Sequence, residues 1–276
     1  MVSFAKSIMR TMNNSNRRLS VLGMQLSTGN RLVSASVDAA GLAISTRMQS
    51  QIRGLEMARR NTEDAMSMLY TADGALSNVS SVLTRVKELT VQAANGTNST
   101  SELEYIEKEV SELLDFIGST GTDTEFNKRT LLDGSSETDG LWIQTGANAG
   151  QGLYINFSEV SLDKLGLDKS DFDFSNMTSS EISGMIDKVG GASDFILSER
   201  ATIGAKINRL EYTTNGIDSM VGNLSDAYSR IADTDMAKTM MEYTKEQIRM
   251  QVSMSMLTNL FDHEQQMVSM LLGSLN

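Results

Sequence analysis

The sequence feature that most constrains the fold is an unbroken 3-4 spacing of apolar residues from position 44 to position 93. Steps of three or four residues reach fifteen positions, of which only Gln51, Thr62 and Thr90 are polar. No proline interrupts the stretch. This pattern predicts one helix of about fifty residues, about 75 Å long at 1.5 Å per residue. Because the stripe is narrow and follows a seven-residue repeat, we expect the helix to pair along its length in a left-handed coiled coil.

The composition favours a thin helical bundle over a large globular core. The 276 residues include 5% aromatic residues, 19 methionines and neither proline nor cysteine. A net charge of −11 argues against binding to nucleic acid. No apolar run is long enough to span a membrane, and the first residues lack the apolar core of a cleaved secretory signal. The absence of cysteine excludes disulfides.

Three further helices follow from the same reasoning. Residues 3–33 form a first helix that Gly29 and Asn30 end or bend. A turn at residues 95–99 precedes a helix over 101–117, with Ser101 and Glu104 at the spacing of a capping box. Because that turn is short, the helix should fold back antiparallel on the long one. A last helix runs from Met236 to about Leu272.

A second long heptad pattern occupies residues 192–231. Isoleucine or leucine recurs every seven residues at Ile196, Ile203, Leu210, Ile217, Leu224 and Ile231. A short helix over 180–189, closed by Gly190 and Gly191, precedes it. The two heptad helices should meet through a shared apolar seam, for which we select Leu69, Leu76, Leu83, Ile203, Leu210, Ile217 and Leu224.

The only strand-like part of the chain lies between the long helices, at about residues 121–167. The segments 141–145 and 153–157 flank a glycine-rich turn and predict a β-hairpin. We therefore expect a mainly α protein, an elongated rod of long antiparallel heptad-patterned helices with a small β region. The rod domain would span residues 41–234, with long helices over 41–95, 101–117 and 192–231. Terminal helices over 1–40 and 235–276 would pair with each other.

The sequence offers no constellation for catalysis, metal binding or cofactor binding. His263 is the only histidine in the chain. A multi-histidine zinc site within one chain is therefore excluded, and a Ser-His-Asp triad could use no other histidine. The segment beginning at Asp171 resembles the start of a calcium-binding loop, but Asn176 and Ile182 replace its glycine and final glutamate. We therefore predict that the chain is not an enzyme and carries no cofactor.

Methionines concentrate in the first and last helices, and two interpretations of them remain open. They could form ordinary core, or they could form an adaptable surface that packs against several slightly different neighbours. The second interpretation suits a protein that polymerises. The methionines concerned are Met9, Met12, Met24, Met236, Met240, Met241, Met250, Met254, Met256, Met267 and Met270.

Several motifs resemble those of bacterial flagellin, and they occur along the chain in the same order as in that family. The N-terminal part contains LSTGNRLVSASVDAAGLAISTRMQSQIRGL, RNTEDAMSMLYTADGAL and LTRVKELTVQAANGTNS. The segments TEFNKRTLLDG and IQTGANAGQGLYI are similar to the first β region of that family. The segment NLSDAYSRIADTDMAKTMMEYTKEQI is similar to its C-terminal signature. The variable outer domain of many flagellins is absent, because residues 167–180 are too few to hold it.

The resemblance implies a function that spacing alone does not. Flagellins are exported unfolded by the flagellar type III apparatus and polymerise into the extracellular filament used for motility. Their terminal helices are disordered in the monomer and form a coiled-coil core on assembly. The implied partners are further copies of the chain, a flagellin-specific export chaperone, and the filament cap and hook-associated proteins, with neither nucleic acid nor a membrane among them.

The resemblance also implies recognition by Toll-like receptor 5. The matching positions are Arg85, Leu89 and Gln92 on one face of the long helix, with Glu109 on the following helix. We expect Leu89 to be partly exposed, because it lies one place away from the seam. The alternative is that this face packs against the next subunit in a filament, and both can hold for monomer and polymer respectively.

Both ends of the chain depart from the usual flagellin pattern. Residues 3–6 replace the usual opening around Asn-His-Asn, and the C-terminal segment LTNLFDHEQQMVSMLLGSLN replaces the usual Gln-Ala-Asn-Gln and proline. Two alternatives to a main filament subunit therefore remain. One is a hook–filament junction protein, which the similarity over residues 124–155 disfavours. The other is a minor or divergent flagellin that acts mainly as an innate immune ligand.

Overall fold

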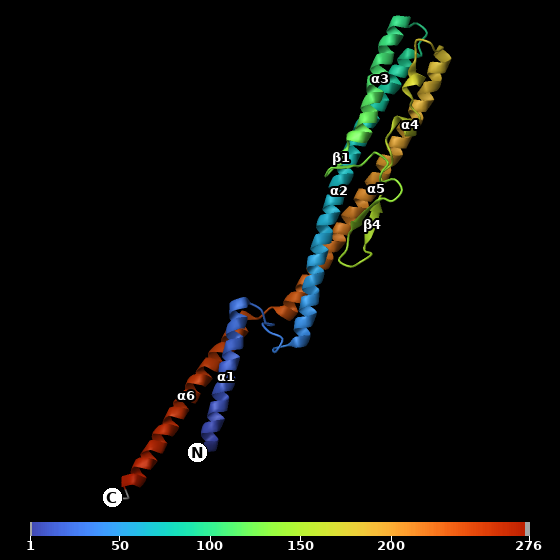
Figure 1. Ribbon diagram of the computed structural model, residues 1–276. Coiled ribbons are helices and arrows are strands. Elements are labelled where there is room, and N and C mark those ends of the chain that lie inside the picture. Colours follow the sequence, from blue (N-terminus) through green and yellow to red (C-terminus); the bar gives the residue numbers. More distant parts are fainter. Residues whose placement is uncertain (1, 274–276) are drawn as a thin grey trace. The chain divides into compact units, whose positions relative to one another are not determined.

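The computed structural model describes residues 2–273, most of which are helical (Figure 1). The expected mainly α class is confirmed. The terminal segments expected over 1–40 and 235–276 include residues 1 and 274–276, which lie outside the described part. The long helices are α1 (Val2–Thr28), α2 (Ala39–Ala93), α3 (Thr100–Asp123), α5 (Ser179–Ala232) and α6 (Met236–Gly273). The shorter elements are β1 (Glu125–Phe126), β2 (Arg129–Thr130), β3 (Leu141–Gln144), β4 (Gly152–Ile155), α4 (Leu162–Leu165) and the 3-10 helix η1 (Lys169–Phe172).

The chain divides into two compact units. Unit 1 combines the two ends of the chain, residues 1–51 and 222–276, and unit 2 comprises residues 52–221. Unit 2 therefore contains α3, the whole β region and most of α2 and α5. In the described chain, no helix combines the length and apolarity that crossing a membrane requires.

Helix α2 realises the apolar stripe as a single helix of 55 residues. Every stripe position from Leu55 to Ala93 is buried. The two polar residues within that stretch satisfy their hydroxyls inside the helix, because Thr62 Oγ1 donates to the carbonyl of Ala58 at 2.8 Å and Thr90 Oγ1 donates similarly. A threonine bonded in this way can occupy an apolar seam without an unpaired polar atom.

Helix α3 begins and ends differently from the prediction. Its capping box is formed by Ser99 and Glu102, whose side chains each bond the other's backbone N–H, so the box expected at Ser101 and Glu104 is wrong. The helix continues past residue 117 to Asp123. At Gly121 a Cβ would overlap the carbonyl oxygen of Val160, so a glycine late in this helix serves a close approach of backbone rather than a helix end.

Helix α5 is continuous from Ser179 to Ala232, so the two separate helices expected over 180–189 and 192–231 are one. Glycine weakens a helix by only about 1 kcal/mol relative to alanine. Val189 and Ala192 on either side of Gly190 and Gly191 are buried, and tertiary packing of this kind supplies most of the stability of a helix in a protein.

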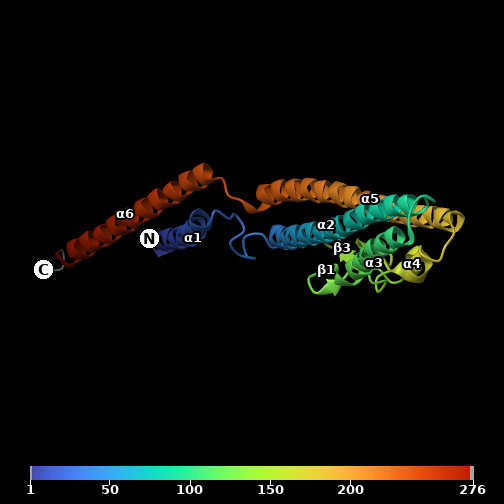
Figure 2. The same ribbon diagram turned by 90° about the horizontal axis from the view of Figure 1, so that it is seen from above.

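Within unit 2, α2, α3 and α5 lie side by side around one hydrophobic cluster (Figures 1 and 2). Arg200 Nε lies 2.9 Å from Asp73 Oδ1, and Arg59 Nη1 lies 3.6 Å from Asp218 Oδ1. Residues early in α2 thus lie beside residues late in α5, which confirms the antiparallel pairing. Of the predicted seam, six members are buried: Leu69, Leu76, Leu83, Ile203, Leu210 and Ile217. Leu224 is half-buried and belongs to unit 1.

The predicted hairpin is confirmed. Strands β3 and β4 pair antiparallel, with Leu141 opposite Ile155 and Gln144 opposite Gly152. A second, smaller hairpin joins β1 and β2 through Asn127 and Lys128, whose φ angles of 50° and 64° suit the tightest hairpin turn.

Candidate subunit interface

Helices α1 and α6 run antiparallel and side by side in unit 1 (Figures 1 and 2). Each turns toward the other a row of buried and half-buried residues at 3-4 spacing, which is the pattern of a coiled coil. On α1 the row is Ala5, Ile8, Met12, Ser15, Leu19, Leu22 and Leu26. On α6 it is Thr239, Tyr243, Glu246, Met250, Ser253, Leu257, Leu260 and Glu264.

The centre of this pair is polar. The carboxylate of Glu246 accepts a hydrogen bond from Ser15 Oγ at 2.8 Å and from Arg18 Nη1 at 3.1 Å. Arg249, one turn further along α6, donates to the same carboxylate at 3.1 Å. The side chain of Glu246 is only 5% exposed. Burial raises the pKa of Glu246, but the hydrogen bonds from Ser15 and Arg18 and the two positive charges outweigh it, so this pKa lies below its ordinary value.

A network of backbone contacts joins the two connectors of unit 1. The guanidinium of Arg31 donates to the carbonyl of Ile231 from Nε at 3.1 Å and from Nη2 at 2.7 Å. The backbone N–H of Arg31 donates to the carbonyl of Ala232, and Thr234 N–H donates to the carbonyl of Gly29. These bonds satisfy carbonyls at the end of α5 and fix where α6 begins relative to the end of α1.

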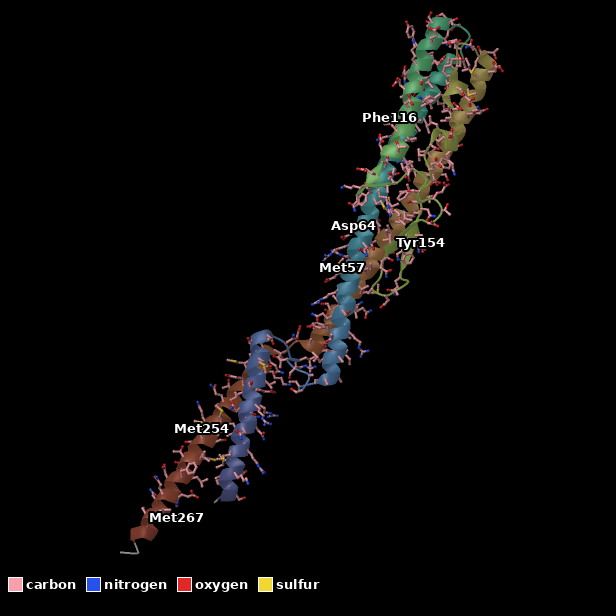
Figure 3. All side chains as sticks on the ribbon, in the orientation of Figure 1. Met57, Asp64, Phe116, Tyr154, Met254 and Met267 are labelled. Carbon is pink, nitrogen blue, oxygen red and sulfur yellow. The ribbon has the colours of Figure 1, made fainter. Side chains whose placement is uncertain are left out.

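The side of α6 turned away from α1 carries exposed apolar side chains among polar ones. Met241, Ile248, Val252 and Met256 are exposed on α6. At about 100° per residue, the first three lie about 120–160° around the helix from Glu246, and Met256 lies about 80° from it. The exposed fraction is 67% for Met241 and 48% for Val252. Met254 and Met267 are also exposed on the same helix (Figure 3). We call Met241, Ile248, Val252 and Met256 the α6 outer face.

A group of large exposed apolar side chains on one side of a helix indicates an interaction surface. Its methionines favour the adaptable-surface interpretation over ordinary core, because their side chains do not pack inside the described part of this chain. A flexible thioether can pack against neighbours of slightly different shape.

The second predicted surface lies on α2 and α3 in unit 2. Arg85 donates to Glu109 Oε1 from Nη2 at 2.7 Å and from Nε at 2.9 Å, and it also contacts Glu88. The hydrogen bond to Glu109 raises the pKa of Arg85. Gln92 is exposed. Leu89 is only 2% exposed, so the expectation that it is partly exposed is wrong.

The packing of three helices explains the burial of Leu89. The prediction placed one seam on α2, but α2 contributes to a cluster shared with both α3 and α5. A helix with two neighbours buries a wider face than a helix in a two-stranded coiled coil. Leu89 and Thr90 are therefore buried together, and Arg85, Gln92 and Glu109 remain at the surface.

A third surface feature was not found by sequence reasoning. The rings of Trp142 and Tyr154 meet edge to face with centroids 4.9 Å apart, and both side chains are exposed on the hairpin. Beside Trp142 lies a cavity of about 340 Å³, which Asp64 on α2 also lines. No group of three metal-ligating side chains occurs within residues 2–273.

Comparisons with known proteins cover most of the chain. The family model described as "Bacterial flagellin N-terminal helical region" matches residues 2–137. The model described as "Bacterial flagellin C-terminal helical region" matches residues 186–271. Together they span α1 to the β region and most of α5 and α6.

Individual relatives agree with these matches. The chain is 38% identical to a flagellin of Bacillus subtilis, with 90% of each chain covered. It is 36% identical to the flagellar filament 33 kDa core protein of Treponema phagedenis, with 95% of each covered. A structure titled as a putative flagellar hook-associated protein from Vibrio parahaemolyticus is similar at a TM-score of 0.63, covering 71% of this chain and all of that one. Its sequence identity is 13%, so this likeness concerns the fold alone.

Proposed function

Because the chain belongs to the bacterial flagellin family, it is a structural protein of the flagellar filament, and we propose that the α6 outer face drives its polymerisation. In the polymer, terminal helices of neighbouring copies cover that face. The homopolymer is extracellular, and motility is the function that it serves.

The observation that carries this proposal is the uneven burial of α6. Its most buried residues, Thr239, Glu246 and Ser253, are polar and face α1, whereas Met241 and Val252 are apolar and exposed. An isolated helical pair normally buries its apolar side and exposes its polar side. The exposed apolar side chains of α6 are stabilised when further helices remove them from water. Copies of the same chain supply such helices in a symmetric assembly.

We further propose that α1 and α6 are largely disordered in the free monomer and fold together on assembly. Of the large apolar side chains in the seam between them only Ile8 and Leu22 are buried, and a buried carboxylate lies at its centre, so the seam yields little hydrophobic stabilisation. Unit 2 has its own hydrophobic cluster and retains its fold alone. Segments that fold on binding lose conformational entropy at that moment, which makes assembly sensitive to small losses of contact.

Export unfolded through the flagellar type III apparatus accounts for two features of the chain. The sequence has no cysteine, so no disulfide can form and block passage as an extended chain. A marginal terminal pair also unfolds at little cost. The partners that this route implies are an export chaperone, the filament cap and the hook-associated proteins.

Seeded growth tests the polymerisation proposal. Purified monomer is added to filament fragments, and filament length is followed by negative-stain electron microscopy. We expect Val252→Asp to abolish growth, because a carboxylate would enter an apolar contact. Gln251→Asp is the matched control, since it adds the same charge at the neighbouring exposed position and should grow normally. Equal growth of the two variants would overturn the role of the outer face.

The same assay separates the alternatives. A hook–filament junction protein would not extend fragments into long filaments at any monomer concentration. A minor or divergent flagellin would extend them only when mixed with another flagellin. The proposal of a self-polymerising subunit requires growth from this chain alone.

We propose recognition by Toll-like receptor 5 as a second function of the monomer, through the exposed residues Arg85, Gln92 and Glu109. The support is that these three polar side chains form one exposed patch across α2 and α3. Arg85→Ala should weaken binding in a direct assay with the receptor ectodomain, while Arg129→Ala, on β2, should not. Leu89→Ala is a poor test because Leu89 is buried, and its loss would act through unfolding. Unaltered binding by Arg85→Ala would exclude the patch.

A further inference from the structure

Glu246 is the one acidic residue at the three most buried positions of α6, and the proposed function does not account for it. A buried carboxylate gives a helical pair little stability, because desolvation offsets its attraction to the arginines. Polar residues at core positions of coiled coils are best known for specifying which register two helices adopt. The pairs of residues that lie opposite each other on α1 and α6 therefore indicate the role of Glu246.

The hydrogen bond from Ser15 to Glu246 sets the register of the antiparallel pair. Seven residues toward the start of α1, Ile8 is level with Ser253, because α6 runs the opposite way. Seven residues toward the end of α1, Leu22 is level with Thr239. All of these residues are buried.

Apolar matching alone would favour a different register. If α6 slipped by one heptad, Ile8 would meet Leu260 in place of Ser253, and Ser15 would meet Ser253. The first of these changes pairs two large apolar side chains and should be favourable. The same slip would place Glu246 against Leu22, away from Ser15. The opposite slip would place Glu246 against Ile8.

We propose that Glu246 is a positioning residue that, together with the bonds between the two connectors, sets the register of the terminal helices, because each one-heptad slip would bury its carboxylate without its two partners from α1. In the observed register the carboxylate is bonded by Ser15 and Arg18, which come from α1. In either slipped register it faces an apolar side chain and keeps only Arg249, which lies on its own helix, and a buried charge that loses partners is unfavourable. Register matters because a slipped pair would displace the α6 outer face by about 10 Å along the helix.

Disulfide competition measures the register directly, because the chain has no cysteine of its own. The full-length chain carries Ile8→Cys, Ser253→Cys and Leu260→Cys in every background. Position 8 can then close a disulfide with position 253 in the observed register or with position 260 in the slipped one. Positions 253 and 260 are about 10 Å apart along one helix, so a disulfide between them forms only where α6 is unfolded; it is identified by its peptide masses and left out of the ratio. The two closed loops have nearly equal lengths, so loop entropy favours neither.

The ratio of the two disulfides is read by peptide mass spectrometry after equilibration in a glutathione buffer. Each disulfide locks the helical pair in one register. The ratio of the two disulfides therefore compares the stabilities of the two registers, even when the helical pair without a disulfide is sparsely populated. With Glu246 present we expect the 8–253 disulfide to dominate by about tenfold or more. Glu246→Leu should lower that ratio by about tenfold or more, since Leu22 would then face a leucine in the slipped register.

Two variants separate register from stability. Thr239→Leu places the same leucine one heptad away, opposite Leu22 in the observed register, and should raise the ratio. Glu246→Gln keeps a polar group that can bond Ser15 and should hold the ratio closer to that of the unchanged chain than Glu246→Leu does. A ratio near one with Glu246 present, or a ratio that Glu246→Leu leaves unchanged, would overturn the proposal.

This inference rests on the proposed function only for its consequence in assembly, and the two can fail separately. The disulfide ratio is measured on monomer and needs no filament. If the ratio behaves as expected and seeded growth fails, the register role stands and the polymerisation proposal does not. If both hold, Glu246→Leu should slow seeded growth, while Thr239→Leu should not.

Discussion

Leu76 gives the sharpest test of where the stability of the monomer resides. It lies in the middle of α2, is 1% exposed and belongs to the hydrophobic cluster of unit 2. Leu76→Ala removes three carbon groups, which at about 0.8 kcal/mol each costs about 2.4 kcal/mol in transfer free energy. The cavity left behind adds to this, so we expect a total loss of about 3–4 kcal/mol in the free energy of unfolding.

The assay is thermal and urea unfolding of the monomer, followed by circular dichroism. For a unit of this size each kcal/mol lowers the Tm by about 2–4 °C, so Leu76→Ala should lower it by about 6–16 °C. Ile44→Ala is the matched control, because Ile44 belongs to the same stripe of the same helix but lies in unit 1 and is 40% exposed. It should cost less than about 1 kcal/mol. Equal losses for the two variants would refute the assignment of monomer stability to unit 2.

Three further predictions concern single sites. Gly121→Ala should destabilise the monomer by about 1–3 kcal/mol in urea unfolding, because its Cβ would overlap the Val160 carbonyl; an unchanged midpoint would show that the contact yields. Ser99→Ala should cost about 1 kcal/mol in the same assay by removing the cap of α3. Because the folded pKa of Glu246 is below its ordinary value of 4.5, its contribution to α1–α6 pairing is complete above that value and is lost as the pH falls through the folded pKa. Terminal helicity of seeded filaments should therefore fall with acid, and Glu246→Gln should remove that part of the pH dependence.

The long helices and the hairpin could be predicted because their signals are local and periodic. The stripe of α2 repeats over many turns, and even its two buried threonines obey the pattern because they bond their own helix. The hairpin combines alternating strands with a glycine-rich turn. In both cases the residues that specify the element lie within it.

The errors arose where a distant segment decides the outcome. We predicted that one helix ends at residue 117 and another at the Gly190–Gly191 pair, yet the first continues to Asp123 and the second to Ala232. We predicted that Leu89 is partly exposed because a heptad pattern accounts for packing against one partner helix, whereas α2 packs against two. The role of Glu246 was missed. The available signal was its position, seven residues from both Thr239 and Ser253 in the inward row of α6, but its partner Ser15 lies at the other end of the chain.

Hydrogen exchange of monomer and filament tests the central claim most directly. We expect the amides of α1 and α6 to exchange rapidly in the monomer and to become strongly protected in the filament. The amides of α2 and α5 within unit 2 should be protected in both. Strong protection of α6 in the free monomer, unchanged by polymerisation, would contradict the claim that neighbouring copies complete the terminal helices.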